Sequence, residues 1–325
     1  MRIHPRVEQV STRFNDIHIE LYLIKGERNI LIDAGTREMP QRDILPTLKA
    51  VGLTLSDIHL ILNTHGHSDH TGGNAAVKTA SGAQVFIHKN DAPFLYDPEH
   101  CFELYFSPVI KAMGEGLQGE KQAFLEEFGT ANVPDQKLEG GEIIDGGSGV
   151  KLQVVHLPGH TLGSVGFYWE EEGILFNGDS LAGLHIGNGK LPIIFDLPEY
   201  IHSVQKLRNI PIRILLCSHH YRTLHLTPGP VRQGKEVSQY LQDCREFAVR
   251  LDEIVRKVAL RTAERGFMQL ADEIIAQLPR EMGFKPLTQV KKPLYYSAQT
   301  IFFNLHRLGK TAGKINGKKE EEIAQ

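Results

Sequence analysis

The sequence has few cysteines and no long apolar run, and each shortage excludes a class of protein. Its three cysteines, Cys101, Cys217 and Cys244, are odd in number and widely spaced, so a disulfide framework is not expected and a reducing compartment is the simpler interpretation. The sequence contains no apolar run of about 18 residues, and its first residues contain no apolar signal core. We therefore expect a cytoplasmic protein that is not bound to a membrane.

An excess of charge of one sign is also missing. Lys and Arg number 36 against 39 Asp and Glu, which gives a formal net charge of -3. Charge therefore supplies neither a basic field for nucleic acid nor a polybasic membrane anchor. With 325 residues, of which 41% are hydrophobic, the chain can bury one large core or a main domain with a smaller addition. We expect a small-molecule substrate and no nucleic-acid partner, and we leave a homodimer open.

What the sequence does contain is a dense group of side chains that bind metals. Residues 58–62 are apolar and of strand length, and they lead into His65, His67, Asp69 and His70, with glycines that let the backbone turn sharply. Side chains two residues apart point to the same side of an extended segment, so His65 and His67 can hold one cation. Asp69 and His70 lie past the turn and can reach a second position. The alternative is a polar loop that is rich in histidine by chance.

This loop alone has too few ligands for two metals, so others must come from elsewhere in the chain. His160, Asp179 and His219, the last with His220 beside it, follow strand-like apolar runs. Asp33 also ends such a run, although taken alone it is better interpreted as a residue that caps a turn. Imidazole and carboxylate ligands without thiolate favour zinc, manganese or iron. We therefore expect two divalent metal ions, with zinc first and iron or manganese as alternatives.

Strand-like and helix-like segments alternate along the chain, which indicates an α/β layer fold. Residues 41–52 and 74–81 have the apolar spacing of helices. The predicted strands are residues 17–24, 29–33, 58–62, 83–88, 152–157, 165–169, 173–176 and 212–216.

Between about residues 91 and 134 the pattern changes to one dense in aromatic side chains and interrupted by glycines. We predict two helical segments around a hinge, inserted near the metal-binding loop. Two interpretations stay open for this helical insertion. It packs as part of the core, or it forms a lid that covers the substrate.

The last hundred residues are predicted to be helical. Apolar residues recur at helical spacing through 237–258, which marks a long amphipathic helix, and shorter helices are expected at 268–278 and 295–308. This C-terminal helical region, residues 231–325, would follow a catalytic domain of residues 1–230. It serves either as a structural cap or as a wall that recognises the substrate.

Taken together, the candidate residues resemble the five sequence motifs of the metallo-β-lactamase superfamily, in particular its glyoxalase II-like members. The residues that carry the resemblance are, in order, Asp33, His65-x-His67-x-Asp69-His70, His160, Asp179 and His219. The resemblance covers about residues 15–225 and implies a four-layer αββα sandwich, in which two facing sheets are each covered by helices. Further helices would be added at the C-terminus.

The resemblance also implies the role of each residue. It puts His65, His67 and His160 on a first metal, puts Asp69, His70 and His219 on a second metal, makes Asp179 the bridge between them, and makes Asp33 a residue that steadies the ligands. The step from Ser218 to His219 fits the family pattern better than the next residue does, so His220 is expected beside the ligands rather than among them. His185, close behind Asp179, is a weaker candidate for the pocket.

The function that these residues predict is metal-assisted hydrolysis. A hydroxide shared by two metals would attack an ester-type substrate, a thioester or a lactone, and Asp69 could accept the released proton. The alternatives are a mononuclear iron dioxygenase acting on a persulfide, a phosphodiesterase, and a binding module that keeps the fold without activity. Oxygen-reducing diiron members resemble His-x-Glu-x-Asp at the central motif, and His67 departs from that pattern.

Overall fold

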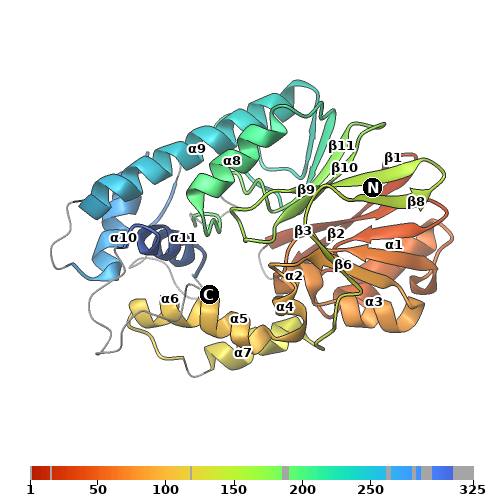
Figure 1. The fold of residues 1–325 in the computed structure, drawn as a ribbon, viewed down its shortest axis with the longest axis horizontal. Helices are drawn as coiled ribbons and strands as arrows, with labels where there is room; N and C mark the ends of the chain where they lie inside the picture. The colour runs from red at the N-terminus through yellow and green to blue at the C-terminus, as the bar shows by residue number, and fades with distance from the viewer. Residues whose placement is uncertain are drawn as a thin grey trace.

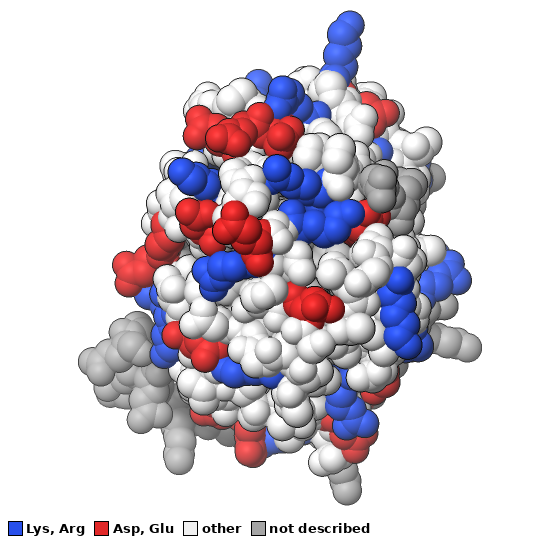
Figure 2. Space-filling model, turned by 90° about the vertical axis from the view of Figure 1, so that its right-hand side faces the viewer, with Lys and Arg blue, Asp and Glu red and all other residues white. Residues whose placement is uncertain are grey.

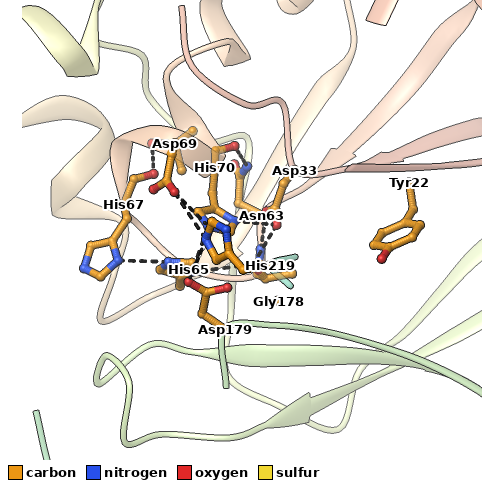
Figure 3. Close-up of polar contacts among 12 residues, drawn as sticks. Tyr22, Asp33, Asn63, His65, His67, Asp69, His70, Gly178, Asp179 and His219 are labelled. Carbon is orange, nitrogen blue, oxygen red and sulfur yellow. Dashed lines mark hydrogen bonds and ion pairs between the residues drawn. The ribbon is translucent and has the colours of Figure 1, made fainter. Parts of the chain in front are cut away.

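The protein is described by a computed structural model, in which two β-sheets face each other and helices cover the outer face of each (Figure 1). The structure describes residues 2–14, 17–117, 119–184, 190–260, 265–279, 283–286 and 295–309. The layers follow the order helix, sheet, sheet, helix, which confirms the predicted αββα sandwich. The metal-binding loop lies where the two sheets meet at one edge (Figure 3).

The first sheet has seven strands, which are adjacent in the order in which the chain makes them. From the first strand to the fourth, each strand is antiparallel to the next. From the fourth to the seventh, each is parallel to the next. The strands are β1 (Arg2–His4), β2 (Val7–Phe14), β3 (Ile17–Ile24), β4 (Asn29–Ile32), β5 (Ile58–Leu62), β6 (Gln84–His88) and β7 (Gln136–Leu138). The carboxyl ends of β4 and β5 therefore meet at one edge, where the predicted ligands begin.

The second sheet has six strands, in which only β11 and β12 are parallel. In spatial order they are β13 (Val231–Gln233), β12 (Ile214–Cys217), β11 (Ile174–Gly178), β10 (Val165–Trp169), β9 (Val150–His156) and β8 (Ile143–Gly147). The edge strand β13 extends this sheet past residue 230, and the helical region begins just after it. The division of the chain into two domains stays a prediction.

Side chains of the central strands point alternately into the core between the sheets and toward the helices. Leu60 and Leu62 of β5 face the second sheet and pack with Phe167 and Phe176, whereas Ile61 faces the helices on the other side. Because both faces of the central strands are covered, apolar residues occupy most positions of these strands rather than every second one. This is why their sequences appear as continuous apolar runs.

The helices fall into two groups, one for each sheet. Short helices and the insertion cover the first sheet: α1 (Leu45–Ala50), α2 (Ser68–Thr71), α3 (Asn74–Ser81), α4 (Pro93–Tyr96), α5 (Pro98–Cys101), α6 (Ser107–Ala112) and α7 (Glu120–Phe128), with a 3-10 turn (Leu55–Asp57) and π-helical segments at Pro40–Ile44 and Phe102–Phe106. Longer helices cover the second sheet, α8 (Leu197–Leu207) and α9 (Lys235–Leu260), and α10 (Phe267–Ala276) and α11 (Tyr295–His306) pack against α9.

The helical insertion and the C-terminal helices meet at the same end of the sandwich. In Figure 1 the yellow helices α4 to α7 lie opposite the blue helix α11, and α11 contacts α6. The three predicted C-terminal helices are confirmed. No helix within the described ranges combines the length and the apolar character needed to cross a membrane.

The opposite end of the molecule carries charges of both signs. Figure 2, which views the right-hand side of Figure 1, shows Lys and Arg interspersed with Asp and Glu on that face. This mixture is in keeping with a formal net charge of only -3.

Candidate metal centre

Three histidines form a tight triangle of ring nitrogens at the edge of the sandwich. His65 Nε2 lies 3.0 Å from His67 Nδ1 and 3.2 Å from His160 Nε2, and the third side, from His160 Nε2 to His67 Nδ1, is 3.1 Å. All three side chains are buried. Nitrogens that converge in this way can share a single cation, so this group is the first candidate site.

The histidines of the first site are held in the form that binds metals. Burial lowers the pKa of His65 well below its usual range, and its histidine neighbours lower it further. Burial, with His160 beside it, lowers the pKa of His67 to about 3. Burial also lowers the pKa of His160, although Asp179 opposes the shift. At neutral pH these imidazoles are therefore uncharged, with lone pairs available to a cation.

A second group lies beside the first and includes a carboxylate. Asp69, His70 and His219 come within ligand distance of one another, with Asp69 Oδ2 3.6 Å from His70 Nε2 and 3.4 Å from His219 Nε2. Burial acts to lower the pKa of His219, but the charges of Asp179 and Asp69 and the hydrogen bonds to them together outweigh burial and raise that pKa to about 10. This second group therefore attracts positive charge strongly.

Asp179 stands between the two groups (Figure 3). Its Oδ2 atom lies 3.6 Å from His160 Nε2 in the first group, and 3.7 Å from His70 Nε2 and 3.2 Å from His219 Nε2 in the second. The seven predicted ligands thus surround one small region. Their order along the chain spans more than 150 residues, and only the pairing of the two sheets brings them together.

The outward nitrogens of three of these histidines are tied to the protein. His70 Nδ1 bonds Asp33 Oδ2 at 2.8 Å, His219 Nδ1 bonds the His18 carbonyl at 2.7 Å, and His160 Nδ1 bonds the Ile193 carbonyl at 2.7 Å. Each bond fixes the tautomer and ring orientation, so that the other nitrogen faces the centre. Such bonds are typical of imidazoles that ligate metals.

Asp33 bonds both His70 and Thr64, and its role in steadying the ligands stays a prediction. It is fully buried and adopts a φ of 59°, which is uncommon for a residue other than glycine. Its oxygens accept from Thr64 N and from Thr64 Oγ1, both at 2.8 Å, in addition to His70. The buried position of this carboxylate is therefore explained by its hydrogen bonds to the centre, and not by the capping of a turn alone.

His220 lies outside both groups. Its Nε2 bonds Glu20 at 2.7 Å, and its ring stacks on His18 with centroids 4.4 Å apart. His18, Glu20 and His220 form a small group of their own, in which Arg13 also bonds His18 Nε2 at 2.9 Å. A guanidinium in that position repels a cation, so we assign no metal there. His185 lies outside the described residues.

The donor set fits two divalent cations. Asp179 Oδ1 and His70 Nε2 are buried and have no hydrogen-bond partner within the described residues. Buried polar atoms are rarely left unpaired, and these two face the centre where a cation would meet them. Histidine and carboxylate without thiolate suits zinc, iron or manganese.

One residue that organises the site was not recognised in the sequence. Asp91 is buried, and its carboxylate accepts from Gly66 N at 2.9 Å, from Thr161 Oγ1 at 2.7 Å and from Gly163 N at 2.8 Å. It therefore ties the loop of His65 and His67 to the loop of His160. The sequence did contain a signal for Asp91, because it comes shortly after the predicted strand 83–88, just as Asp33 comes at the end of the predicted strand 29–33.

The C-terminal helix α11 is tied to the same site through an intervening loop. Ser297 Oγ, Thr300 Oγ1 and Asn304 Oδ1 accept from the backbone N–H groups of Leu191 (2.7 Å), Ile194 (3.0 Å) and Leu197 (2.9 Å). Thr300 Oγ1 also donates to the Pro192 carbonyl at 2.6 Å. The loop that these bonds fix presents the Ile193 carbonyl to His160. The helix α11 thus supports the candidate ligand His160. This role differs from both interpretations of the C-terminal region, a structural cap and a wall that recognises the substrate.

The chain belongs to the metallo-beta-lactamase superfamily, which its residues 19–219 match. A hydroxyacylglutathione hydrolase from Pelagibacter ubique is 31% identical over 170 residues, which make up 51% of this chain and 54% of that relative. A hydroxyacylglutathione hydrolase from Pseudomonas entomophila is 29% identical over 231 residues, 66% of this chain and 73% of the relative. The chain is thus a distant homologue of these hydrolases.

The likeness to solved structures extends over more of the chain. A metallo-beta-lactamase family protein from Thermus thermophilus has a TM-score of 0.70 at 21% identity and is covered, like this chain, over 95% of its length. By contrast, the chain spans little more than half of two hydroxyacylglutathione hydrolases that it matches, 54% of one and 56% of the other. The first likeness shows the fold, including the C-terminal helices.

Proposed function

We propose that this protein is a dinuclear metal-dependent hydrolase that cleaves ester-type bonds, thioesters or lactones. One observation carries the proposal: a single oxygen, Asp179 Oδ2, lies within 3.7 Å of histidine nitrogens from both ligand groups. A carboxylate in that position would bridge two cations held by these groups. Membership in the superfamily and distant homology to hydroxyacylglutathione hydrolases support the same class.

Under this proposal each ligand group holds one ion, and zinc is the metal we expect. The first ion would be held by His65, His67 and His160, the second by Asp69, His70 and His219, and both by Asp179. Bound there, two zinc ions would supply a hydroxide nucleophile near neutral pH and Lewis acidity toward the substrate carbonyl.

The side chains of the centre orient the reaction and move the proton. Asp69 has the more exposed of the two central carboxylates, at 21% against 6% for Asp179. It lines the cavity next to the centre, so the Asp69 carboxylate is placed to take the proton that the nucleophile releases. Asp33, the His18 carbonyl and the Ile193 carbonyl hold the imidazoles still while charge develops.

An ester-type substrate is preferred over a phosphodiester because of the cavity beside the centre. Its described lining is largely apolar and aromatic, and apart from histidines it includes one cationic side chain, Lys190, against Glu120 and Glu127. Polyanionic nucleic acid is bound mainly through Lys and Arg. Absence of a nucleic-acid partner, a homodimer and a cytoplasmic location stay predictions.

The test is a turnover screen on protein whose metal content has been measured. Thioesters, lactones and bis-p-nitrophenyl phosphate should be compared, with two equivalents of zinc per chain. Hydrolysis of a thioester or lactone is expected. Activity on the phosphodiester alone would show that the protein is a phosphodiesterase. About one iron per chain, with oxygen consumption on a persulfide, would support the dioxygenase instead. Full metal occupancy without any turnover would favour a binding module.

A further inference from the structure

The cavity beside the metal centre has a polar end and an apolar end. It encloses about 290 Å³. The candidate ligands His67, Asp69, His160, Asp179 and His219 line the polar end. The apolar end is lined from the helical insertion, by Phe102, Phe106, Ile110, Phe124 and Phe128. A substrate whose reacting group reaches the ligands therefore directs any attached arm along the insertion.

The apolar end is held in shape by contacts between aromatic rings. The Phe124 ring lies 4.5 Å from Phe106, 4.7 Å from Phe128 and 5.3 Å from Phe102, measured between centroids. The Phe102 and Ile110 side chains are buried in the core that covers the first sheet. A pocket whose walls are packed in this way is formed before a ligand arrives, and its apolar surface favours an arm without polar groups.

We infer that this cavity binds the acyl arm of the substrate, and that the arm is an aliphatic chain on the acyl side of a thioester or lactone. The inference rests on the proposed hydrolase function. Biological thioesters join an acyl group to a polar, water-soluble thiol, so the half that suits a phenylalanine-lined pocket is the acyl half. The polar half then lies toward solvent.

The size and charge of the cavity restrict the arm further. At the ~30 Å³ that a water-sized group occupies, about ten non-hydrogen atoms fill such a cavity. Glu120 and Glu127, both on α7, add two carboxylates to its lining against the single ammonium of Lys190. An arm that ends in a carboxylate is therefore bound less well than an aliphatic arm of the same length.

The substrate series that tests this inference varies only the acyl arm. Acetyl, butanoyl, succinyl and octanoyl thioesters of N-acetylcysteamine are compared on the zinc-loaded protein. Complete burial of one methylene is worth about fourfold in binding, so kcat/KM should rise at least about tenfold from butanoyl to octanoyl. The succinyl thioester should fall below the butanoyl one. Equal kcat/KM values for all four thioesters would show that the cavity does not bind the acyl arm, and would leave the proposed hydrolase function in place.

A pair of lactones tests which side of the ester bond carries the arm. In α-hexyl-γ-butyrolactone the chain is on the acyl side, and in its γ-hexyl isomer the chain is on the alcohol side. The α-hexyl isomer should have the higher kcat/KM. Equal or reversed values would overturn the assignment to the acyl side.

Two neighbouring positions on α7 provide a matched pair of variants. Ala123 is exposed and lines the cavity, so Ala123→Phe fills the apolar end without disturbing a buried position. Gln122 is also exposed, and its side chain bonds Glu126 one turn along the helix. Ala123→Phe should lower the ratio of octanoyl to acetyl kcat/KM about tenfold or more, whereas Gln122→Phe should leave that ratio unchanged. Equal ratios in both variants would contradict the inference.

Binding without turnover separates this inference from the proposed function. Acetohydroxamate and octanohydroxamate share one metal-binding group and differ in the arm, and calorimetry gives the Kd of each. Tighter binding of octanohydroxamate, reduced by Ala123→Phe, is the expected result. That result in a protein that hydrolyses no ester would overturn the hydrolase and keep the pocket, whereas equal Kd values would overturn the pocket.

Discussion

The two ends of the active cavity are built on different principles. At the metal end, polar side chains from loops after β4, β5, β9, β11 and β12 are buried and tied by hydrogen bonds to one another or to the backbone. At the other end, apolar rings of one inserted segment pack without directional bonds. We therefore expect the reaction to depend on the exact placement of a few ligand atoms, and the choice of substrate to depend on the volume of the apolar end. Substitutions at the first end should abolish activity, and those at the second should change the preference.

The largest effect is expected from the bridging carboxylate. Asp179→Ala removes the one oxygen that reaches both ligand groups, so both ions should be lost and activity should fall by about 10⁴-fold. Metal analysis by plasma emission, beside thioester kinetics, measures both. Two ions per chain in the variant would contradict the bridge.

Two adjacent histidines give the next largest contrast. His219 faces Asp69 and Asp179, whereas His220 bonds Glu20 outside the centre. His219→Ala should therefore empty the second site and cost more than the roughly 10- to 100-fold that is typical of losing an outer partner. His220→Ala should keep both ions. The opposite pattern in metal content would show that His220, and not His219, is the ligand.

Asp91 tests whether the hydrogen bonds between loops matter as well as the ligands themselves. Three donors converge on its two oxygens, and Asp91→Asn replaces one acceptor with a donor. We expect the affinity for the first ion to fall roughly 10- to 100-fold, with the fold kept.

The matched control for Asp91 lies on the exposed start of α5. Asp97 accepts there from His100 N, a role that asparagine fills equally well. Asp97→Asn should therefore bind metal like the unmodified protein. A competition titration with a zinc-binding dye compares the two variants, and equal affinities would show that Asp91 is only part of the core.

The smallest effect at the metal end is expected from α11, which acts on His160 at a distance. Thr300→Val keeps the side-chain shape but removes a hydroxyl that bonds Ile194 N and the Pro192 carbonyl. Loss of such a bond costs about 1 kcal/mol, roughly fivefold in affinity for the first ion. The same titration measures it. Thr47→Val, which removes a bond from α1 to the Asp43 carbonyl in the segment before it, is the control and should not change metal affinity.

The metal end was largely predictable from the sequence, because strand ends bring their loops to one edge. His65, His67, His160 and Asp179 each follow an apolar run, and the run itself marks where the sheet stops. Asp91 follows such a run as well. Its partners Thr161 and Gly163 are some 70 residues away, and nothing local in the sequence pairs them with it.

The parts that the sequence did not predict depend on long-range pairing. Strands β1 and β2 are rich in polar residues, β7 and β13 have three residues each, and β8 ends in Asp145, Gly146 and Gly147, so each is stable only because a neighbouring strand completes its hydrogen bonds. The bonds from α11 to residues 191–197 join segments 106 or 107 residues apart. Amphipathic spacing predicted that a helix exists there, but not which loop it holds.

The most direct test of the dinuclear centre is a zinc titration of the metal-free protein with thioester hydrolysis followed at each step. If both ligand groups hold an ion and Asp179 joins them, two equivalents of zinc should bind per chain. Activity should then stay low until the second equivalent is added. Full activity at one equivalent of metal, or no change in activity as the second equivalent binds, would contradict a dinuclear hydrolase.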